Sequence, residues 1–331
     1  MKEAVKIYQL IKNSNNIVIT SHLSPDGDSI GSSLALYRFI SVLGKSAQIC
    51  HPDSCPDFLK WIIDDDIIID FENHRLEVID QMKSADLIFC LDYNTQDRLG
   101  SSMGEILSSC KAKKVMIDHH VNPSEFVDIT ISESSASSTS ELVYELINYS
   151  GNLELMNSDI GTPIYLGIIS DTGSFRFSSV SSRTHYIVSH LLNIGVDHVN
   201  IYQKTFDSNR IDKIKLHSYI ISNRLEVINS YKVSIISVTE DILSSFNYIK
   251  GDTEGLVNLA LSIKGIEIAA FFTQKGDKVK ISLRSKGLFS VNTILTDHFN
   301  GGGHKYAAGG INNDSIENTI LKFKSLLPKY F

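Results

Sequence analysis

Aspartate and histidine side chains follow short apolar segments at several points in this sequence, in a pattern that suits metal binding. The positions are His22, Asp26, Asp28, Asp92, Asp118, His119, His120 and Asp171. We interpret the apolar segments as four separate strands, each of which is followed by an Asp at its carboxyl end. In an open parallel sheet that edge is where ligands bind. The pattern therefore predicts one shared site of carboxylates and imidazoles.

The residue types of this site predict divalent cations. Imidazole with carboxylate suits Mn²⁺, Fe²⁺ or Zn²⁺, and the excess of carboxylates favours Mn²⁺ or Mg²⁺. So many acids on one edge would raise each other's pKa unless cations neutralised them. Two metal ions about 3.5–4 Å apart would do so, and would activate water and clamp a phosphoryl group. Alone, Asp26 and Asp28 would suit a turn and Asp92 a helix N-cap, but turn chemistry does not require acid at all four ends.

Short apolar runs and helical periodicity alternate along the first two thirds of the chain. The apolar runs predict strands at 17–19, 47–50, 87–91 and 115–117. Helical spacing predicts helices around 4–11, 29–43, 76–82 and 140–148. This alternation predicts an α/β fold, a parallel sheet with helices on both faces. The serine-rich run 132–140 predicts a loop that ends in a helix N-cap rather than a flexible linker.

The length of 331 residues suggests two domains. We predict a site-bearing domain over 1–195, a helical linker over 196–227 and a smaller α/β domain over 228–331. The smaller domain should contain strands at 232–238, 266–273 and 278–284 and a helix at 256–261.

Composition excludes some classes of function. The chain has 31 Lys+Arg and 38 Asp+Glu, a net charge of −7, which disfavours coating or tracking long nucleic acid. A small phosphorylated substrate held by a few basic groups stays compatible with this charge. The four cysteines, without CxxC spacing, favour reduced thiols in a cytoplasm. The sequence shows neither an apolar run of roughly 18 residues nor a signal peptide, so we expect a cytoplasmic protein without membrane contact.

The acidic series resembles the four motifs of the DHH phosphoesterase superfamily, over about residues 16–180. The resemblance rests on His22-x3-Asp26-x-Asp28, Asp92, Asp118-His119-His120 and Asp171. The run Gly301-Gly302-Gly303-His304 resembles the glycine-rich motif of the DHH-associated domain. Further similarity to the bacterial nanoRNases lies in Arg98-Leu99-Gly100, Ala136-Ser137-Ser138-Thr139 and Asp171-Thr172-Gly173-Ser174-Phe175-Arg176-Phe177.

The resemblance implies roles for these side chains. A first metal would be held by His22, Asp26 and Asp92. A second would be held by Asp28, Asp92, His119 and Asp171, with Asp92 bridging. His120 would face the substrate phosphate, and Asp118 would orient the ligand imidazoles from behind. Substrate would be bound by Arg98, Arg284, Gly301, Gly302, Gly303 and His304. Judged on residues alone, the glycine run suits either a flexible loop or an anion-binding nest, and Arg284 either a solvated strand end or a phosphate ligand.

The resemblance also implies an activity. It implies Mn²⁺-dependent hydrolysis of short oligoribonucleotides to 5′-mononucleotides, and removal of the 3′-phosphate of adenosine 3′,5′-bisphosphate. Cleavage of cyclic or linear dinucleotides, or of inorganic pyrophosphate or polyphosphate, stays open as an alternative. A non-catalytic nucleotide sensor is disfavoured because no expected metal ligand is missing. The expected partners are short RNA and small phosphorylated nucleotides, and a homodimer stays open.

Overall fold

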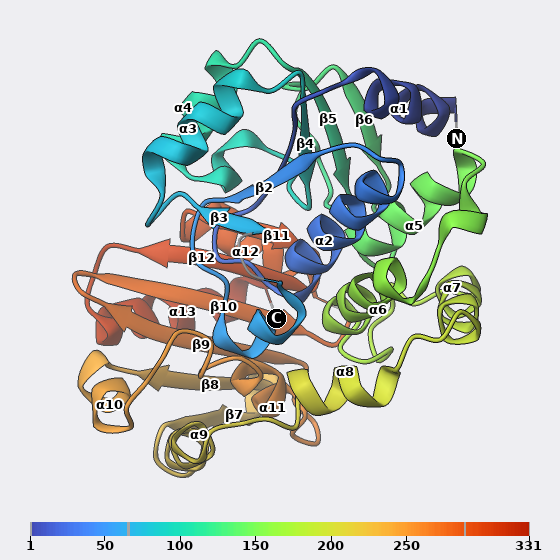
Figure 1. Ribbon diagram of the computed structural model, residues 1–331. Coiled ribbons are helices and arrows are strands. Elements are labelled where there is room, and N and C mark those ends of the chain that lie inside the picture. Colours follow the sequence, from blue (N-terminus) through green and yellow to red (C-terminus); the bar gives the residue numbers. More distant parts are fainter. Residues whose placement is uncertain (1, 65–66, 288, 331) are drawn as a thin grey trace. The chain divides into compact units, whose positions relative to one another are not determined.

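The computed structural model describes residues 2–64, 67–287 and 289–330, and the chain divides into two compact units, 1–208 and 209–331 (Figure 1). The division falls inside the segment expected to form a linker. The predicted α/β class is confirmed in both units. Among the described residues, no helix has both the length and the apolar character that crossing a membrane requires.

The first unit contains a six-stranded parallel sheet in the order β3-β2-β1-β4-β5-β6. Its strands are β1 Ile17–Ser21, β2 Ala47–His51, β3 Ile68–Asp70, β4 Leu87–Leu91, β5 Lys113–Asp118 and β6 Ile129–Ser132. The chain runs outward from β1 to β3 on one side and from β4 to β6 on the other. The sheet therefore changes direction between β1 and β4, and ligands bind at the carboxyl ends of strands at such a switch point.

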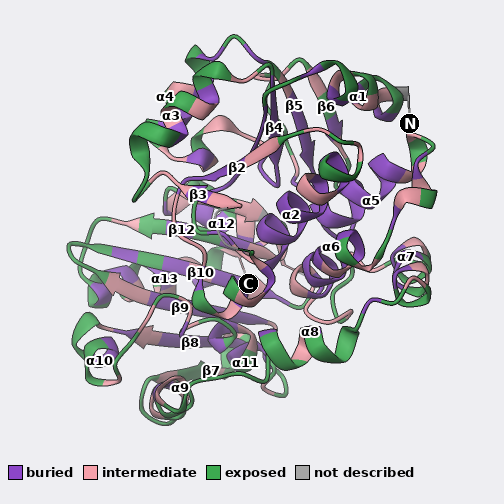
Figure 2. Cartoon of the chain, in the orientation of Figure 1, coloured by how far each residue is buried: buried purple, intermediate pink, exposed green. Residues whose placement is uncertain are grey.

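Helices cover both faces of this sheet, as predicted. The helices of this unit are α1 Lys2–Asn13, α2 Gly27–Val42, α3 Arg75–Ser84, α4 Ser101–Ser109, α5 Thr139–Tyr149, α6 Ser158–Asp171, α7 Ser182–Asn193 and α8 His198–Thr205. Successive side chains of a strand point to opposite faces. Ile17 and Ile19 accordingly join one buried cluster with α2, α5 and α6, while Val18 joins a second cluster with α3 and α4. In Figure 2 most of α2, α5 and α6 is coloured as buried.

Two glycines allow α2, α5 and α6 to pack closely. A Cβ atom on Gly31 of α2 would lie 2.5 Å from the carbonyl oxygen of Pro163 in α6. A Cβ atom on Gly167 of α6 would lie 1.9 Å from the hydroxyl oxygen of Ser140 in α5. Both distances are shorter than any van der Waals contact. Only glycine therefore fits, and the close approach brings the acidic ends of these helices together.

One sequence-based prediction for this unit is wrong. The apolar element that delivers Asp171 is the buried helix α6, so acid stands at three strand ends and one helix end. The helix is buried almost all round, and a short apolar run of this kind cannot be assigned to helix or strand by periodicity alone. The prediction for the serine-rich run is confirmed, because the Ser138 side chain caps α5.

The second unit contains a mixed six-stranded sheet in the order β11-β12-β10-β9-β8-β7. Its strands are β7 Leu225–Ile228, β8 Val233–Val238, β9 Ile268–Lys275, β10 Lys278–Ser285, β11 Gly302–His304 and β12 Ala307–Asn312. Its helices are α9 Ile211–Asn223, α10 Glu240–Ser245, α11 Leu256–Leu261, α12 Val291–His298 and α13 Ile316–Tyr330. The predicted strands and helix are found here. The linker was expected to be helical up to residue 227. In the structure, helix α9 ends at Asn223, and strand β7 begins at Leu225.

Candidate metal centre

Five elements of the first unit, β1, β4, β5, α2 and α6, bring the predicted acids and histidines together. His22 follows β1, Asp92 follows β4, Asp118 ends β5 directly before His119 and His120, and Asp171 ends α6. Asp26 and Asp28 stand at the start of α2. Most of these side chains are buried. The exceptions are Asp26 and Asp171, whose side chains are 49% and 26% exposed, so the centre is open to solvent at these two acids.

The side chains form three groups whose potential ligand atoms lie within 4.8 Å of one another. The groups are His22 with Asp26 and Asp92, Asp28 with His119 and Asp171, and Asp92 with His119 and His120. The first group has the residues of the first ligand set that the resemblance implied. The second group has three of the four residues of the second set, and the fourth, Asp92, joins His119 in the third group. The structure thus brings all the expected ligands together in one place.

Asp92 lies between the groups. Its Oδ2 is 3.3 Å from His22 Nε2, while its Oδ1 is 3.6 Å from His119 Nε2. Its backbone has a φ of +64°, and its N–H donates to the carbonyl of Ile117 on the neighbouring strand. A left-handed non-glycine residue costs conformational energy and is often found at functional sites. The turn directs Oδ2 toward His22 and Oδ1 toward His119.

Each of the three histidines is held through its Nδ1 edge. His22 Nδ1 lies 2.9 Å from the Leu23 carbonyl, and His119 Nδ1 lies 3.3 Å from the Ala136 carbonyl. Both rings therefore present Nε2 to the carboxylates, the arrangement typical of metal-ligating histidines. Asp118 was expected to orient these ligand rings. In the structure its Oδ1 instead lies 2.7 Å from Nδ1 of His120, and its Oδ2 accepts the His120 backbone N–H.

Two of the carboxylates also serve as helix-terminus acceptors. Asp26 is the N-cap of α2, and its Oδ1 accepts the backbone N–H groups of Asp28 and Ser29. Asp28 accepts backbone N–H groups at the start of α5. This α5 turn was not predicted to belong to the site. Its signals in the sequence were the serine- and threonine-rich N-cap and the run Ala136-Ser137-Ser138-Thr139, which was used only for the family resemblance.

The protein environment changes the pKa of several groups in the centre. Burial opposes ionisation of His22, but its hydrogen bond to Asp92 and the charge of Asp26 outweigh burial and raise its pKa to about 9. Burial would also raise the pKa of Asp92, but the hydrogen bond and charge of His22 hold it at about 2. Burial, together with the charge of Asp92, raises the pKa of Asp118 to about 7.

The same causes act on Asp28, where burial and the charges of Asp92 and Asp171 raise the pKa well above its ordinary value. Crowded carboxylates that raise each other's pKa attract cations. Oxygen donors together with imidazole nitrogens suit Mn²⁺ and related divalent ions. The residues present therefore fit a divalent-metal centre.

Arg98 lies in a short 3-10 helix, Gln96–Leu99, next to the centre. Its positive charge helps to lower the pKa of Asp92 and offsets part of the rise in the pKa of Asp118. Its carbonyl accepts the backbone N–H of Leu23, which connects this helix to the segment that carries His22. The structure thus places a cation beside the cluster, where it could meet an anionic substrate.

The other expected substrate residues belong to the second unit. Arg284 is half-buried near the end of β10, and its Nη1 donates to the carbonyl of Leu283. Three residues of the glycine run, Gly302–His304, form strand β11, which pairs with β12. A Cβ atom on Gly301 would lie 2.3 Å from the Gly309 carbonyl oxygen, so close strand packing explains that glycine. At Gly302 the nearest atom would be 4.0 Å away. The side chain of His304 lies outside the described part of the chain.

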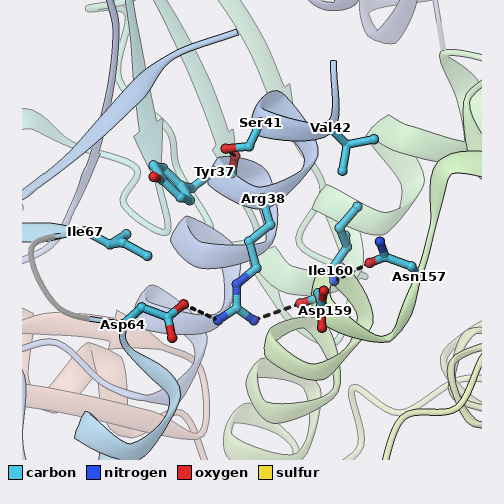
Figure 3. A pocket seen from close by; sticks show the side chains of 9 residues that line it. All are labelled: Tyr37, Arg38, Ser41, Val42, Asp64, Ile67, Asn157, Asp159 and Ile160. Atoms are coloured by element: carbon cyan, nitrogen blue, oxygen red, sulfur yellow. Dashed lines mark hydrogen bonds and ion pairs between the residues drawn. The ribbon is translucent and has the colours of Figure 1, made fainter. Parts of the chain in front are cut away.

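A separate pocket of about 410 Å³ lies between α2 and the start of α6 (Figure 3). Arg38 lies in it and donates to the Asp159 carbonyl at 2.8 Å and to Asp64 Oδ2 at 3.4 Å. None of the predicted site residues lines it. Because protein oxygens already accept from the guanidinium, we assign no ligand to this pocket.

Family models match both units. The model of the DHH family N-terminal domain matches residues 16–168, and that of the DHHA1 domain matches residues 227–328. A solved structure described as an exopolyphosphatase-related protein from Bacteroides fragilis is 37% identical, with a TM-score of 0.93, and covers 99% of this chain and 96% of that one. The chain belongs to the DHH family of divalent-metal-dependent phosphoesterases.

Two further relatives have names that state their substrates. The bifunctional oligoribonuclease and PAP phosphatase NrnA of Bacillus subtilis is 25% identical over 307 residues, which cover 92% of this chain and 91% of that protein. The cyclic-di-AMP phosphodiesterase PdeA of Listeria monocytogenes is 27% identical over 319 residues, which cover 90% of this chain but 45% of that protein. The match thus covers nearly the whole length of the Bacillus subtilis protein but less than half of the Listeria monocytogenes protein.

Proposed function

We propose that this chain hydrolyses short oligoribonucleotides to 5′-mononucleotides and removes the 3′-phosphate of adenosine 3′,5′-bisphosphate. The observation that carries the proposal is a centre in which Asp92 joins two ligand groups at the carboxyl ends of β1, β4 and β5. The near full-length match to a bifunctional oligoribonuclease and PAP phosphatase supports this choice of substrates.

Two divalent cations would occupy the centre, and we propose that they are Mn²⁺. His22, Asp26 and Asp92 would hold one, and Asp28, Asp92, His119 and Asp171 the other. When bound, such ions polarise a phosphoryl oxygen and lower the pKa of water. The open side at Asp26 and Asp171 gives a phosphate group access, while the buried ligands keep their orientation.

His120 and Arg98 would stabilise charge on the phosphoryl group. The bond to Asp118 holds the His120 ring from behind through Nδ1. Because the Asp118 side chain is fully buried, this bond is protected from water. A preoriented donor stabilises developing oxyanion charge more than a mobile one does. Arg98 adds a permanent cation beside Asp92 and Asp118.

The second unit would bind the nucleotide beyond the scissile phosphate. Arg284 offers a planar guanidinium that suits phosphate. Gly302 offers backbone with open space around it, because a Cβ atom there would have no neighbour closer than 4.0 Å. We assign Arg284 and Gly302 to substrate binding on this basis and on the family resemblance, and Gly301, Gly303 and His304 on the family resemblance alone.

A substrate panel tests the proposal. Purified protein with saturating Mn²⁺ should hydrolyse linear diribonucleotides and adenosine 3′,5′-bisphosphate faster than cyclic di-AMP, pyrophosphate or a long oligonucleotide. Removing the metal with a chelator should abolish turnover, and adding Mn²⁺ back should restore it. Preferential hydrolysis of pyrophosphate or of the long strand would contradict the proposal.

Cyclic dinucleotide hydrolysis is the second candidate, because the chain is 27% identical to a cyclic-di-AMP phosphodiesterase over 90% of its own length. The same panel separates the two functions. A higher kcat/KM for cyclic di-AMP than for its linear product would favour the second candidate. The reverse order would favour the oligoribonuclease.

A further inference from the structure

The start of α5 contacts two of the acids in the metal centre. The backbone N–H of Thr139 donates to Asp28 Oδ2 at 2.7 Å, and that of Ser140 donates to Asp28 Oδ1 at 2.9 Å. The Thr139 hydroxyl donates to Asp92 Oδ1 at 3.0 Å. One helical turn thus holds Asp28 of one ligand group and Asp92, which lies between the groups.

Local sequence explains why this turn is available. Ser138 has an extended backbone and caps the helix, with its hydroxyl oxygen accepting the N–H of Glu141. The first N–H groups of a helix have no partner within it, and the helix dipole favours negative charge there. Asp28 accepts two of these groups. Thr139 and Ser140 are fully buried, so water does not compete for these bonds.

The hydroxyl of Thr139 bears on the orientation of Asp92. The terminal torsion of an aspartate carboxylate has a broad, nearly two-fold energy profile, so packing alone fixes it weakly. Asp92 must direct Oδ2 to His22 and Oδ1 to His119 at the same time. The hydrogen bond that the Thr139 hydroxyl donates to Oδ1 opposes rotation of the carboxylate plane.

We propose that Thr139 is a positioning residue that fixes the Asp92 carboxylate so that its two oxygens serve two cations. The first turn of α5 fixes Asp28 in the same way through backbone N–H groups. The inference rests on the metal centre in the proposed function. Thr139 itself is not a metal ligand.

Two substitutions isolate the hydroxyl. Thr139→Val keeps the branched shape but removes the donor, and Thr139→Ser keeps the donor. Loss of a group that orients a ligand typically weakens metal affinity by about 10–100-fold. Isothermal titration calorimetry can measure Mn²⁺ binding to the metal-stripped full chain without substrate. It should show this increase in Kd for Thr139→Val. Thr139→Ser should return Kd close to the wild-type value.

Thr184→Val is a matched control. Thr184 is also fully buried, and its hydroxyl donates to a carboxylate, Glu141 Oε2, at 2.9 Å. Glu141 is not among the candidate metal ligands. This variant and Thr139→Val should both lose thermal stability in the metal-free state, but Thr184→Val should bind Mn²⁺ with wild-type affinity.

The outcomes separate this inference from the proposed function. Wild-type Mn²⁺ affinity in Thr139→Val, or equal weakening in Thr184→Val, would overturn the positioning role. Failure of the wild-type protein to bind Mn²⁺ would overturn the metal centre and the inference together. If the wild type binds Mn²⁺ and the variants behave as expected, but no nucleotide is hydrolysed, the inference holds and the proposed function fails.

Discussion

Asp92 combines the properties that a bridging ligand needs. It is buried, its φ of +64° turns it out of the strand direction, and its two oxygens face different histidines. Sequence analysis located this residue because a compact apolar strand ends directly before it. The left-handed backbone and the bond from Thr139 could not be predicted, because both depend on contacts with residues distant in the chain.

Replacing His120 with alanine should separate metal binding from turnover. The ring is held by Asp118 and is proposed to donate to the phosphoryl group. Loss of one such donor typically lowers kcat by about 10²–10³-fold. Metal content measured by elemental analysis should stay close to that of the wild type. A fall in bound metal would instead identify His120 as a ligand.

His51 predicts a pH dependence of stability. It ends β2, is buried, and its Nδ1 has no hydrogen-bond partner among the described residues. Burial and the charge of His22 lower its pKa to about 3. In the unfolded chain its pKa is about 6.5, so the unfolded state binds the proton first as pH falls. Its contribution to stability is therefore complete above pH 6.5 and decreases below it.

His51→Gln should remove this contribution. The difference in unfolding free energy between wild type and variant should change by up to about 1.4 kcal/mol for each pH unit below 6.5. Urea unfolding at pH 7.5, 6.5 and 5.5 measures it. Because other titrating groups are common to both proteins, the comparison isolates His51. A difference that is constant with pH would show that His51 takes up its proton equally in both states.

Among the elements, strands buried on both faces were predicted best. The runs that predicted β1, β4 and β5 are short, apolar and continuous. The edge strands β3 and β6 have three and four residues and are half-buried, and they were not predicted, although Ile67, Ile68 and Ile69 form an apolar run at β3. β11 was missed because its glycines have low strand propensity. Its pairing with β12 depends on close backbone approach, which a sequence pattern does not show.

Gly167→Ala tests whether close helix packing positions the acids. The added methyl group would lie 1.9 Å from Ser140 Oγ and 2.7 Å from Asp28 Oδ1. Overpacking of this kind typically costs about 1–3 kcal/mol, against a gain of about 1 kcal/mol in helix propensity. We expect lower stability in urea unfolding and weaker Mn²⁺ binding. Gly104→Ala in α4, whose nearest contact would be 3.2 Å, should leave Mn²⁺ binding unchanged. Equal Mn²⁺ affinity in the two variants would contradict the packing argument.

At the scale of the whole molecule, each unit has its own sheet and its own buried clusters on both faces. Sequence analysis predicted the α/β class and the change of pattern between the two parts. The candidate metal ligands could be located from the sequence because each stands beside an apolar element. The candidate substrate residues could be named only from family resemblance, since an arginine on a mixed strand and a glycine run have several structural explanations.

Arg284→Ala tests the division of roles between the units. If Arg284 binds the nucleotide, its loss removes a charge-assisted hydrogen bond worth about 1.5–3 kcal/mol. The kcat/KM for a diribonucleotide should fall by roughly 10–150-fold, while hydrolysis of bis-p-nitrophenyl phosphate should barely change. Lys280→Ala is the control, because Lys280 is an exposed cation on the same face of β10. Equal losses on both substrates would assign Arg284 to the reaction centre.

The number of Mn²⁺ ions bound by Asp92→Asn tests the shared metal centre most directly. Asparagine tolerates the left-handed backbone, so the variant should fold. Equilibrium dialysis with elemental analysis should find two Mn²⁺ ions per wild-type chain and loss of binding at both groups in the variant, with diribonucleotide turnover at background. Two bound ions and near wild-type turnover in Asp92→Asn would contradict the centre described here.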